Sequence, residues 1–336
     1  MLKNEIRLIL SGKTIKEPQR FDSLEEIYKH LNLDNKKNRV TDAQLRYIEE
    51  GNVTVIDYFC EDYPESLREL ENPPLVLYIK GKLKIMQLPL AVVGTRYPSG
   101  YGEKCVKYLI PYLVKSGFDI ISGMARGIDA LSHTETINNK GYTIAVLGSG
   151  IDVVYPPENK KLYEKIEKNG CIISEFPPTT KPVRYNFPLR NRIIAALSKG
   201  TLVIEADIKS GSLITARLTE ELSKPVFAVP GEIFAKRSKG TNKLISQGAV
   251  IVNDIESILS YFYIELKREI EKTKEEKKFN LSDKEAKILK AITGDISIDE
   301  LMIKTDMTIS ELNDVLFDLE IKGLIRHTPS DMYEKL

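Results

Sequence analysis

The sequence of 336 residues has no tryptophan, three cysteines and three histidines. The cysteines lie far apart, at Cys60, Cys105 and Cys171, which favours reduced thiols in a cytoplasmic protein over a disulfide framework. The histidines are equally scattered, so the spacing of a metal site is absent and no metal is expected.

Long apolar runs are also absent. No stretch of about eighteen apolar residues occurs, so no membrane span is expected. The N-terminal stretch "MLKNEIRLILSGKTIKEPQR" has no cleavage-site pattern, so no signal peptide is expected either. With 49 basic and 48 acidic residues the net charge is only +1. A polyanionic partner would therefore have to be held by a local patch.

Residues 1–56 are predicted to form a small helical module. The segment "SLEEIYKHL" places its apolar residues on one face, and Ser23 with Glu26 has the pattern of a capping box. A second helix is predicted after Thr41, with Gln44 reaching back to the cap.

Residues 57–264 show a different pattern, in which short apolar runs alternate with helical stretches. The runs are rich in valine and isoleucine, as buried parallel strands are. They lie at 90–93, 118–122, 143–148, 171–174, 201–206, 225–229 and 249–253. Seven strands with helices between them predict an α/β fold with a doubly wound, mostly parallel sheet.

The C-terminal part reads as a charged linker at 265–279 and a separate domain at 280–336. Three helical patterns and a hairpin candidate, in that order, predict a winged-helix-like domain. Its third helix carries four acidic residues, Glu311, Asp314, Asp318 and Glu320. A recognition helix must approach phosphates, so we expect an accessory or protein-interaction module instead.

Small residues and cations follow most of the predicted strands. Ligands of doubly wound sheets bind outside the carboxyl ends of the strands, and glycine, serine, lysine and arginine there suit anions. The candidate residues are Gly94, Arg96, Ser122, Gly123, Arg126, Gly127, Arg184, Phe187, Arg190, Asn191, Arg192, Lys209, Ser210, Gly211 and Ser212. Together they predict a phosphate-binding face larger than a mononucleotide requires.

A nucleotide cofactor is disfavoured. The dinucleotide motif needs a glycine two residues after Gly94, where this chain has Arg96, and no phosphate-binding P-loop motif occurs. Catalysis is disfavoured too. His133 follows Asp129 by four residues and reads as half of a helix-face pair, while Ser149 and Ser212 have no evident histidine partner. We expect a protein that is not an enzyme and has no cofactor.

The segment "PVRYNFPLRNRIIAALS" surrounds Phe187 with cations. Single-stranded nucleic acid is held in this way, by cations on phosphates and an aromatic ring on a base. Phe187 could equally be a core residue. Arg190 and Arg192 are two apart on a helix and point in different directions, so one of them is expected to be structural.

The chain resembles the DNA-processing protein A family, also called DprA or Smf. The motifs "VVGTR", "SGMARGIDALSH", "GSGIDVVYPPEN", "FPLRNRIIAALS", "SGSLITA" and "KGTNKLISQGA" carry the resemblance, which covers about residues 57–255. It implies an extended Rossmann-like fold that binds single-stranded DNA without consuming it. It also implies a homodimer through the α/β domain, and loading of the recombinase RecA during natural transformation.

The resemblance also assigns roles to residues. Arg96 and Arg184 would contact phosphates and Phe187 would stack on a base. Supporting donors would come from Ser122, Gly123, Lys209, Ser210 and Gly211.

Two rivals remain. One is a Rossmann-like nucleotide hydrolase of the lysine-decarboxylase-like group. Its glutamate-bearing motif has no match in "PGEIFAKRSKGTN", where no glutamate follows Gly240-Thr241. The other is a transcription factor that would bind duplex DNA through its C-terminal domain. The acidic third helix of that domain argues against it.

Overall fold

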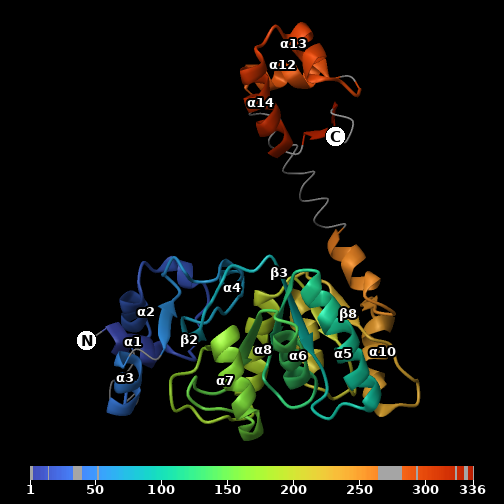
Figure 1. Cartoon of the computed structure of the whole chain (residues 1–336). Helices are drawn as coiled ribbons and strands as arrows, with labels where there is room; N and C mark the ends of the chain where they lie inside the picture. The colour runs from blue at the N-terminus through green and yellow to red at the C-terminus, as the bar shows by residue number, and fades with distance from the viewer. Residues whose placement is uncertain are drawn as a thin grey trace. The chain divides into compact units, whose positions relative to one another are not determined.

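The computed structural model describes residues 3–13, 15–32, 40–50, 53–263, 282–292, 294–321, 324–328 and 332–335. The chain forms two compact units, Met1–Leu259 and Ser260–Leu336 (Figure 1). The linker predicted at 265–279 lies outside the described residues.

A nine-stranded sheet forms the centre of the first unit. Its strands are β1 (Thr54–Asp57), β2 (Val76–Gly81), β3 (Leu88–Val93), β4 (Phe118–Ser122), β5 (Thr143–Leu147), β6 (Cys171–Ser174), β7 (Thr201–Val203), β8 (Val226–Ala228) and β9 (Val250–Ile251). Their order is β1-β2-β6-β5-β4-β3-β7-β8-β9. All pairs from β6 to β9 are parallel. The predicted α/β class with a mostly parallel sheet is confirmed.

Two strands of the sheet, β1 and β2, were not predicted from the sequence. Both are antiparallel and extend the sheet beyond β6. β1 has only four residues and β2 follows two prolines. Neither therefore shows the alternation of strand and helix from which the other seven were predicted.

The parallel strands are connected by helices on both faces. The helices are α5 (Gly100–Lys115), α6 (Ile128–Asn138), α7 (Lys160–Asn169), α8 (Asn186–Leu197), α9 (Ser212–Glu221) and α10 (Lys239–Ser246), with short turns α4 (Glu65–Arg68), η2 (Pro157–Asn159) and η3 (Lys236–Ser238). Right-handed crossovers put α5, α6 and α7 on one face, and α8 with α9 on the other (Figure 1). The strand order reverses between β3 and β7, where a crevice opens at the carboxyl ends.

The N-terminal helices pack on the antiparallel end of the sheet. They are α1 (Lys3–Leu10), α2 (Leu24–His30) and α3 (Asp42–Glu49), with the turn η1 (Pro18–Arg20). Ile6, Leu10 and Ile27 share a core cluster with Tyr78 of β2. Arg7 of α1 pairs with buried Asp57 of β1 at 2.6 Å. These helices and the sheet therefore share one core.

The predicted caps of α2 and α3 form, with one difference. The Thr41–Gln44 capping box is confirmed. Ser23 accepts from the Glu26 backbone N–H as predicted, but the Glu26 carboxylate accepts from the backbone of Asp22.

The second unit is a small helical domain with a hairpin. It contains α12 (Asp283–Ala291), α13 (Ile298–Thr305), α14 (Ile309–Ile321), β10 (Ile325–His327) and β11 (Tyr333–Lys335), which pair antiparallel. Its core includes Ile288, Leu301, Leu312 and Leu316. This is the order predicted for a winged-helix-like domain.

Cys60, Cys105 and Cys171 are free thiols, as predicted. Within the described ranges, no helix combines the length and the apolar character that crossing a membrane requires.

His133 of α6 is fully buried in the first unit. The Thr143 hydroxyl donates to the Ile120 carbonyl, so it accepts from Nδ1 of His133 at 2.7 Å. Nε2 has no partner among the described residues. Burial lowers the pKa of His133 to about 3, and the nearby charge of Arg190 acts in the same direction.

We expect His133 to make the protein less stable in mild acid. Between pH 3 and the ordinary value of 6.5, the unfolded chain binds a proton that the folded chain does not. Stability therefore falls as pH drops through this window, by roughly 1.4 kcal/mol per pH unit. Urea unfolding at pH 7.5 and 5.5 should show the loss in the wild type and a smaller loss in His133→Asn. An equal loss in both would contradict this assignment.

Candidate nucleic-acid interface

A cleft of about 680 Å³ opens at the reversal point of the sheet. Its wall comes from the loop after β3, the first turn of α6, the segment leading into α8 and the segment leading into α9. Ten predicted site residues line it: Gly94, Arg96, Arg184, Phe187, Arg190, Asn191, Lys209, Ser210, Gly211 and Ser212.

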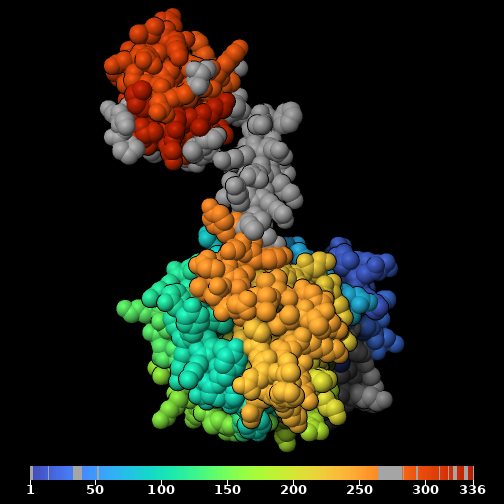
Figure 2. Space-filling view, turned by 90° about the vertical axis from the view of Figure 1, so that its right-hand side faces the viewer, coloured from blue at the N-terminus to red at the C-terminus, as the bar shows by residue number. Residues whose placement is uncertain are grey.

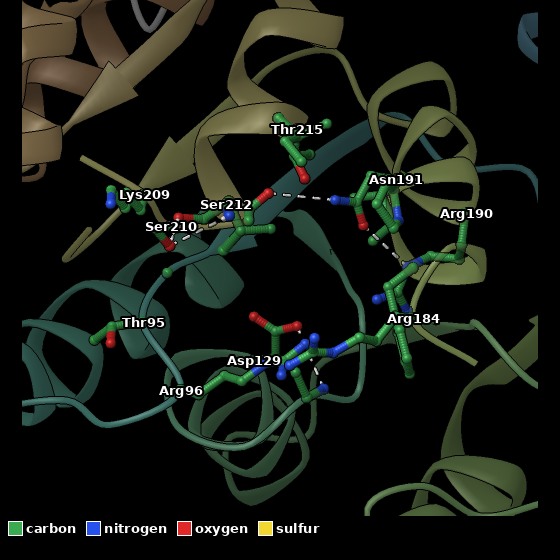
Figure 3. Close-up of a pocket in the computed structure, with 18 of the residues that line it drawn as sticks. Thr95, Arg96, Asp129, Arg184, Arg190, Asn191, Lys209, Ser210, Ser212 and Thr215 are labelled. Carbon is green, nitrogen blue, oxygen red and sulfur yellow. Dashed lines mark hydrogen bonds between the residues drawn. The ribbon is translucent and has the colours of Figure 1, made fainter. Parts of the chain in front are cut away.

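Three exposed cations surround the opening. Arg96, Arg184 and Lys209 have exposed side chains and form no ion pair with the described residues. Figure 3 shows Arg184 and Lys209 on opposite sides of the cleft, with Arg96 reaching in from the loop after β3. Two carboxylates also line the cleft: Asp207 pairs with Lys236 at 3.6 Å, and the buried Asp129 lies in the field of Arg190. The free charge in the cleft is therefore positive.

Two helices begin at the cleft. Asn186 starts α8, and Gly211 caps α9 without a side-chain hydrogen bond. The hydroxyls of Ser210 and Ser212 lie 2.7 Å apart at the start of α9. The Ser210 N–H donates to the Asp207 carbonyl and the Ser212 N–H to the Ser210 hydroxyl. The two hydroxyls and the positive end of the helix dipole make this terminus favourable for an anion.

Phe187 supplies an aromatic surface between the cations. Its ring is half-buried and lines the cleft. The guanidinium carbons of Arg96 and Arg190 lie 5.8 and 5.9 Å from its centre, and the Tyr155 ring lies at 5.7 Å. An arginine, two rings and a hollow in this arrangement can hold a flat base next to a phosphate.

Arg190 lies in the floor of the cleft. It is 4% exposed, and its Nη1 donates to the carbonyl oxygens of Gly123, at 2.7 Å, and Val146. Burial lowers its pKa to about 10, while the charge of Asp129 opposes that shift. Burial likewise raises the pKa of Asp129, against the effect of Arg190. The two groups stabilise each other's charged forms.

Arg192 points elsewhere. Its guanidinium forms a two-fold pair with the buried Glu175, at 2.9 and 2.7 Å, and donates to the backbone of Asn72. Of the two arginines, one was predicted to be structural. In the structure both have protein partners, and only Arg190 lines the cleft.

Five predicted site residues do not line the cleft: Ser122, Gly123, Arg126, Gly127 and Arg192. The Ser122 side chain is fully buried and donates to the Val92 carbonyl. Asp129 accepts from the backbone N–H of Ala125 and lies near the charge of Arg190, whereas Arg126 pairs with Glu158.

Gly94 has a packing role that the sequence did not reveal. A β-carbon there would lie 2.6 Å from the Ile128 side chain and 3.0 Å from the Glu205 carbonyl. The glycine lets α6 and the chain after β7 approach the end of β3, which shapes the cleft.

Other lining residues, among them Tyr97 and Tyr155, were not predicted from the sequence. Tyr97 and Tyr155 lie in segments that follow strands, and only the small residues and cations of such segments were used for the prediction. Exposed aromatic residues beside such cations were the signal that could have identified them.

Comparisons with known proteins agree with this architecture. The model of the DNA recombination-mediator protein A family matches residues 54–263, and that of the DprA winged helix domain matches 272–331. The chain belongs to the DNA recombination-mediator protein A family. The winged-helix assignment of the second unit is confirmed with it. The nucleotide-hydrolase alternative is not favoured, because the family match covers the whole sheet.

Named relatives include Protein Smf from Synechocystis, 37% identical over 310 residues, with 82% of this chain and 78% of the relative covered. DNA processing protein DprA from Bacillus subtilis is 41% identical over 214 residues, covering 63% and 72%.

Solved DprA structures are similar as well. DNA processing protein A from Streptococcus pneumoniae has a TM-score of 0.62 and 37% identity, covering 70% of this chain and 80% of that one. A structure of DNA processing protein A from Helicobacter pylori, described for its single-stranded DNA binding mode, has a TM-score of 0.58 and 31% identity, covering 63% and 96%.

We expect the two cleft arginines at 184 and 190 to differ in their effect on folding. Arg190→Met removes the donor to the carbonyl oxygens of Gly123 and Val146 and the positive charge near the buried Asp129, so it should cost about 3–5 kcal/mol of unfolding free energy. The exposed Arg184→Met should stay within about 0.5 kcal/mol of wild type. Urea denaturation measures both. Equal stability of the two variants would show that Arg190 does not brace the floor.

Proposed function

We propose that the cleft binds single-stranded DNA without catalysing a reaction on it. The observation that carries the proposal is the exposed Arg96, 5.8 Å from the centre of the Phe187 ring, with the exposed Arg184 lining the same cleft. Cations on phosphates and stacking on a ring recognise a single strand of any sequence. The relative from Helicobacter pylori, described for binding single-stranded DNA, supports this ligand.

In this proposal the side chains have distinct roles. Arg96, Arg184 and Lys209 contact phosphates, and Phe187 stacks on a base. Asn191, the Gly211 N–H and the hydroxyls of Ser210 and Ser212 donate to the strand. Gly94 and Arg190 shape the cleft, while Ser122, Gly123, Arg126, Gly127 and Arg192 support it from outside.

Charge reversal in the cleft should weaken DNA binding strongly. Arg96→Glu and Arg184→Glu replace a phosphate contact with repulsion, so a labelled oligothymidine should bind at least about tenfold more weakly. Neutral Arg96→Gln should lower the salt slope of log K by about 0.7, the value for one phosphate contact to a single strand. Fluorescence anisotropy across a salt series measures both.

The matched control is Arg46→Glu, a reversal at an exposed arginine of α3 outside the cleft. It changes net charge equally and should bind like wild type. If Arg46→Glu and Arg96→Glu lost affinity equally, the binding would reflect overall charge, and the cleft would not be the site.

We propose that the protein is a homodimer formed through the first unit. β9 is an edge strand, and unpaired edges favour pairing with another chain. Large apolar side chains are exposed at and near the last two strands: Ile251 is 42% exposed, Ile233 73% and Phe234 90%. The surface around β9 and the helical residues 256–263 faces the viewer in Figure 2 (orange).

A lysine at these apolar positions should separate the subunits. Ile251→Lys with Phe234→Lys places charge in an interface that excludes water, so the dimer should dissociate at least about tenfold more readily. Sedimentation equilibrium gives the mass, and Ile303→Lys in the second unit is the control, with its wild-type side chain 84% exposed. A variant that keeps the wild-type mass would refute this surface.

We also propose that the bound strand is protected and passed to the recombinase RecA in the cytoplasm during natural transformation. The family to which the chain belongs is described as recombination mediators, which supports this role. RecA ATP hydrolysis on a strand coated with single-strand-binding protein should rise when the wild type is added, and should not rise with Arg96→Glu.

A further inference from the structure

A row of tyrosines is exposed on α5. Tyr101, Tyr108 and Tyr112 are 48%, 49% and 48% exposed. Spacings of seven and four residues place all three on one face of a helix. The rings of Tyr108 and Tyr112 lie 5.4 Å apart at a tilt of 59°. We call this row, with Lys104 and Lys115, the tyrosine stripe.

Lysines accompany the tyrosines. Lys104 is three residues after Tyr101, and Lys115 is three after Tyr112, so both flank the row. Both are exposed, and neither forms an ion pair with the described residues. The only acidic residue of α5, Glu103, is two residues from Tyr101 and so faces another direction. The stripe therefore combines aromatic surface with positive charge.

The stripe begins at the cleft. Tyr97, four residues before Tyr101, is 66% exposed and lines the cleft. Buried Glu205, just after β7, fixes the start of α5 by accepting from the backbone N–H and hydroxyl of Ser99. A β-carbon at Gly102 would lie 2.3 Å from that carboxylate, so glycine permits this attachment. The first turn of α5 is thus held rigidly at the reversal point of the sheet.

The length of the stripe suits several nucleotides. Eleven residues separate Tyr101 from Tyr112, which corresponds to about 16 Å along a helix. The outer surface of α5 is visible as the teal part of the first unit in Figure 2. A strand leaving the cleft past Tyr97 would meet Tyr101 next, and then the two further rings.

We propose that the tyrosine stripe is a second binding surface for the same single-stranded DNA, continuous with the cleft. This inference rests on the proposed function of the cleft, and it adds the path that the strand follows after leaving the cleft, along α5. Bases stack on Tyr101, Tyr108 and Tyr112, while Lys104 and Lys115 follow the phosphates. Stacking on rings needs no particular base, so the surface suits a strand of any sequence.

Two oligothymidines distinguish the stripe from the cleft. A short one of about 6 nucleotides fills the cleft, and a long one of about 20 nucleotides also covers α5. Tyr108→Ala with Tyr112→Ala should weaken binding of the long oligonucleotide about tenfold or more, since each stacked ring contributes about 1–3 kcal/mol. Binding of the short one should stay within about twofold.

Conservative variants are the matched controls. Tyr108→Phe with Tyr112→Phe keeps the rings and should bind both oligonucleotides like wild type. Lys104→Gln with Lys115→Gln should lower the salt slope for the long oligonucleotide by about 1.4, the value for two phosphate contacts. Lys165→Gln with Lys168→Gln, at exposed positions of α7, should leave it unchanged. Thermal unfolding confirms that each variant folds.

The outcomes separate the two proposals. Wild-type affinity of the alanine variant for the long oligonucleotide overturns the stripe, while loss of binding in Arg96→Glu still supports the cleft. If Arg96→Glu binds like wild type and only the alanine variant fails, the cleft proposal falls and the stripe holds the strand. A fall in sedimenting mass with unchanged DNA binding would identify α5 as a contact between subunits, and would also overturn the stripe.

Discussion

The buried guanidinium of Arg190 holds together the segments that form the floor of the cleft. It joins α8 to the carbonyl oxygens at the ends of β4 and β5 and faces Asp129 of α6. A buried charge without a partner is costly, so each of these elements must stay in place around it. The geometry of the cleft follows from this constraint.

The cations near the cleft consequently fall into two groups. Arg190 and Arg192 have protein partners and are only 4% and 8% exposed, so their charges stabilise the fold and are not available to a ligand. Arg96 and Arg184 stay exposed on a rigid floor. Preorganised cations next to a ring would bind a flexible strand with little rearrangement of the protein, in keeping with the proposed function.

The winged-helix unit is acidic, in contrast to the positively charged cleft of the first unit. Residues 282–336 contain twelve Asp or Glu residues and seven Lys or Arg residues. On α14, the side chain of Glu311 pairs with Lys284 of α12. The nearly neutral charge of the whole chain therefore conceals an acidic tail and a basic remainder. Such a tail would repel phosphates, and its fold alone does not make it a DNA reader.

The sequence by itself determined the seven parallel strands, the winged-helix order and the face on which a polyanion would bind, because apolar period and strand-end composition are local properties. It did not reveal β1, which has only four residues, or β2, which follows two prolines. Tertiary structure alone decided which charges are free. Arg192 meets Glu175 and Arg126 meets Glu158 across 17 and 32 residues. Such pairs form only when distant elements pack together, and the spacing of residues along the chain does not show which side chains will meet.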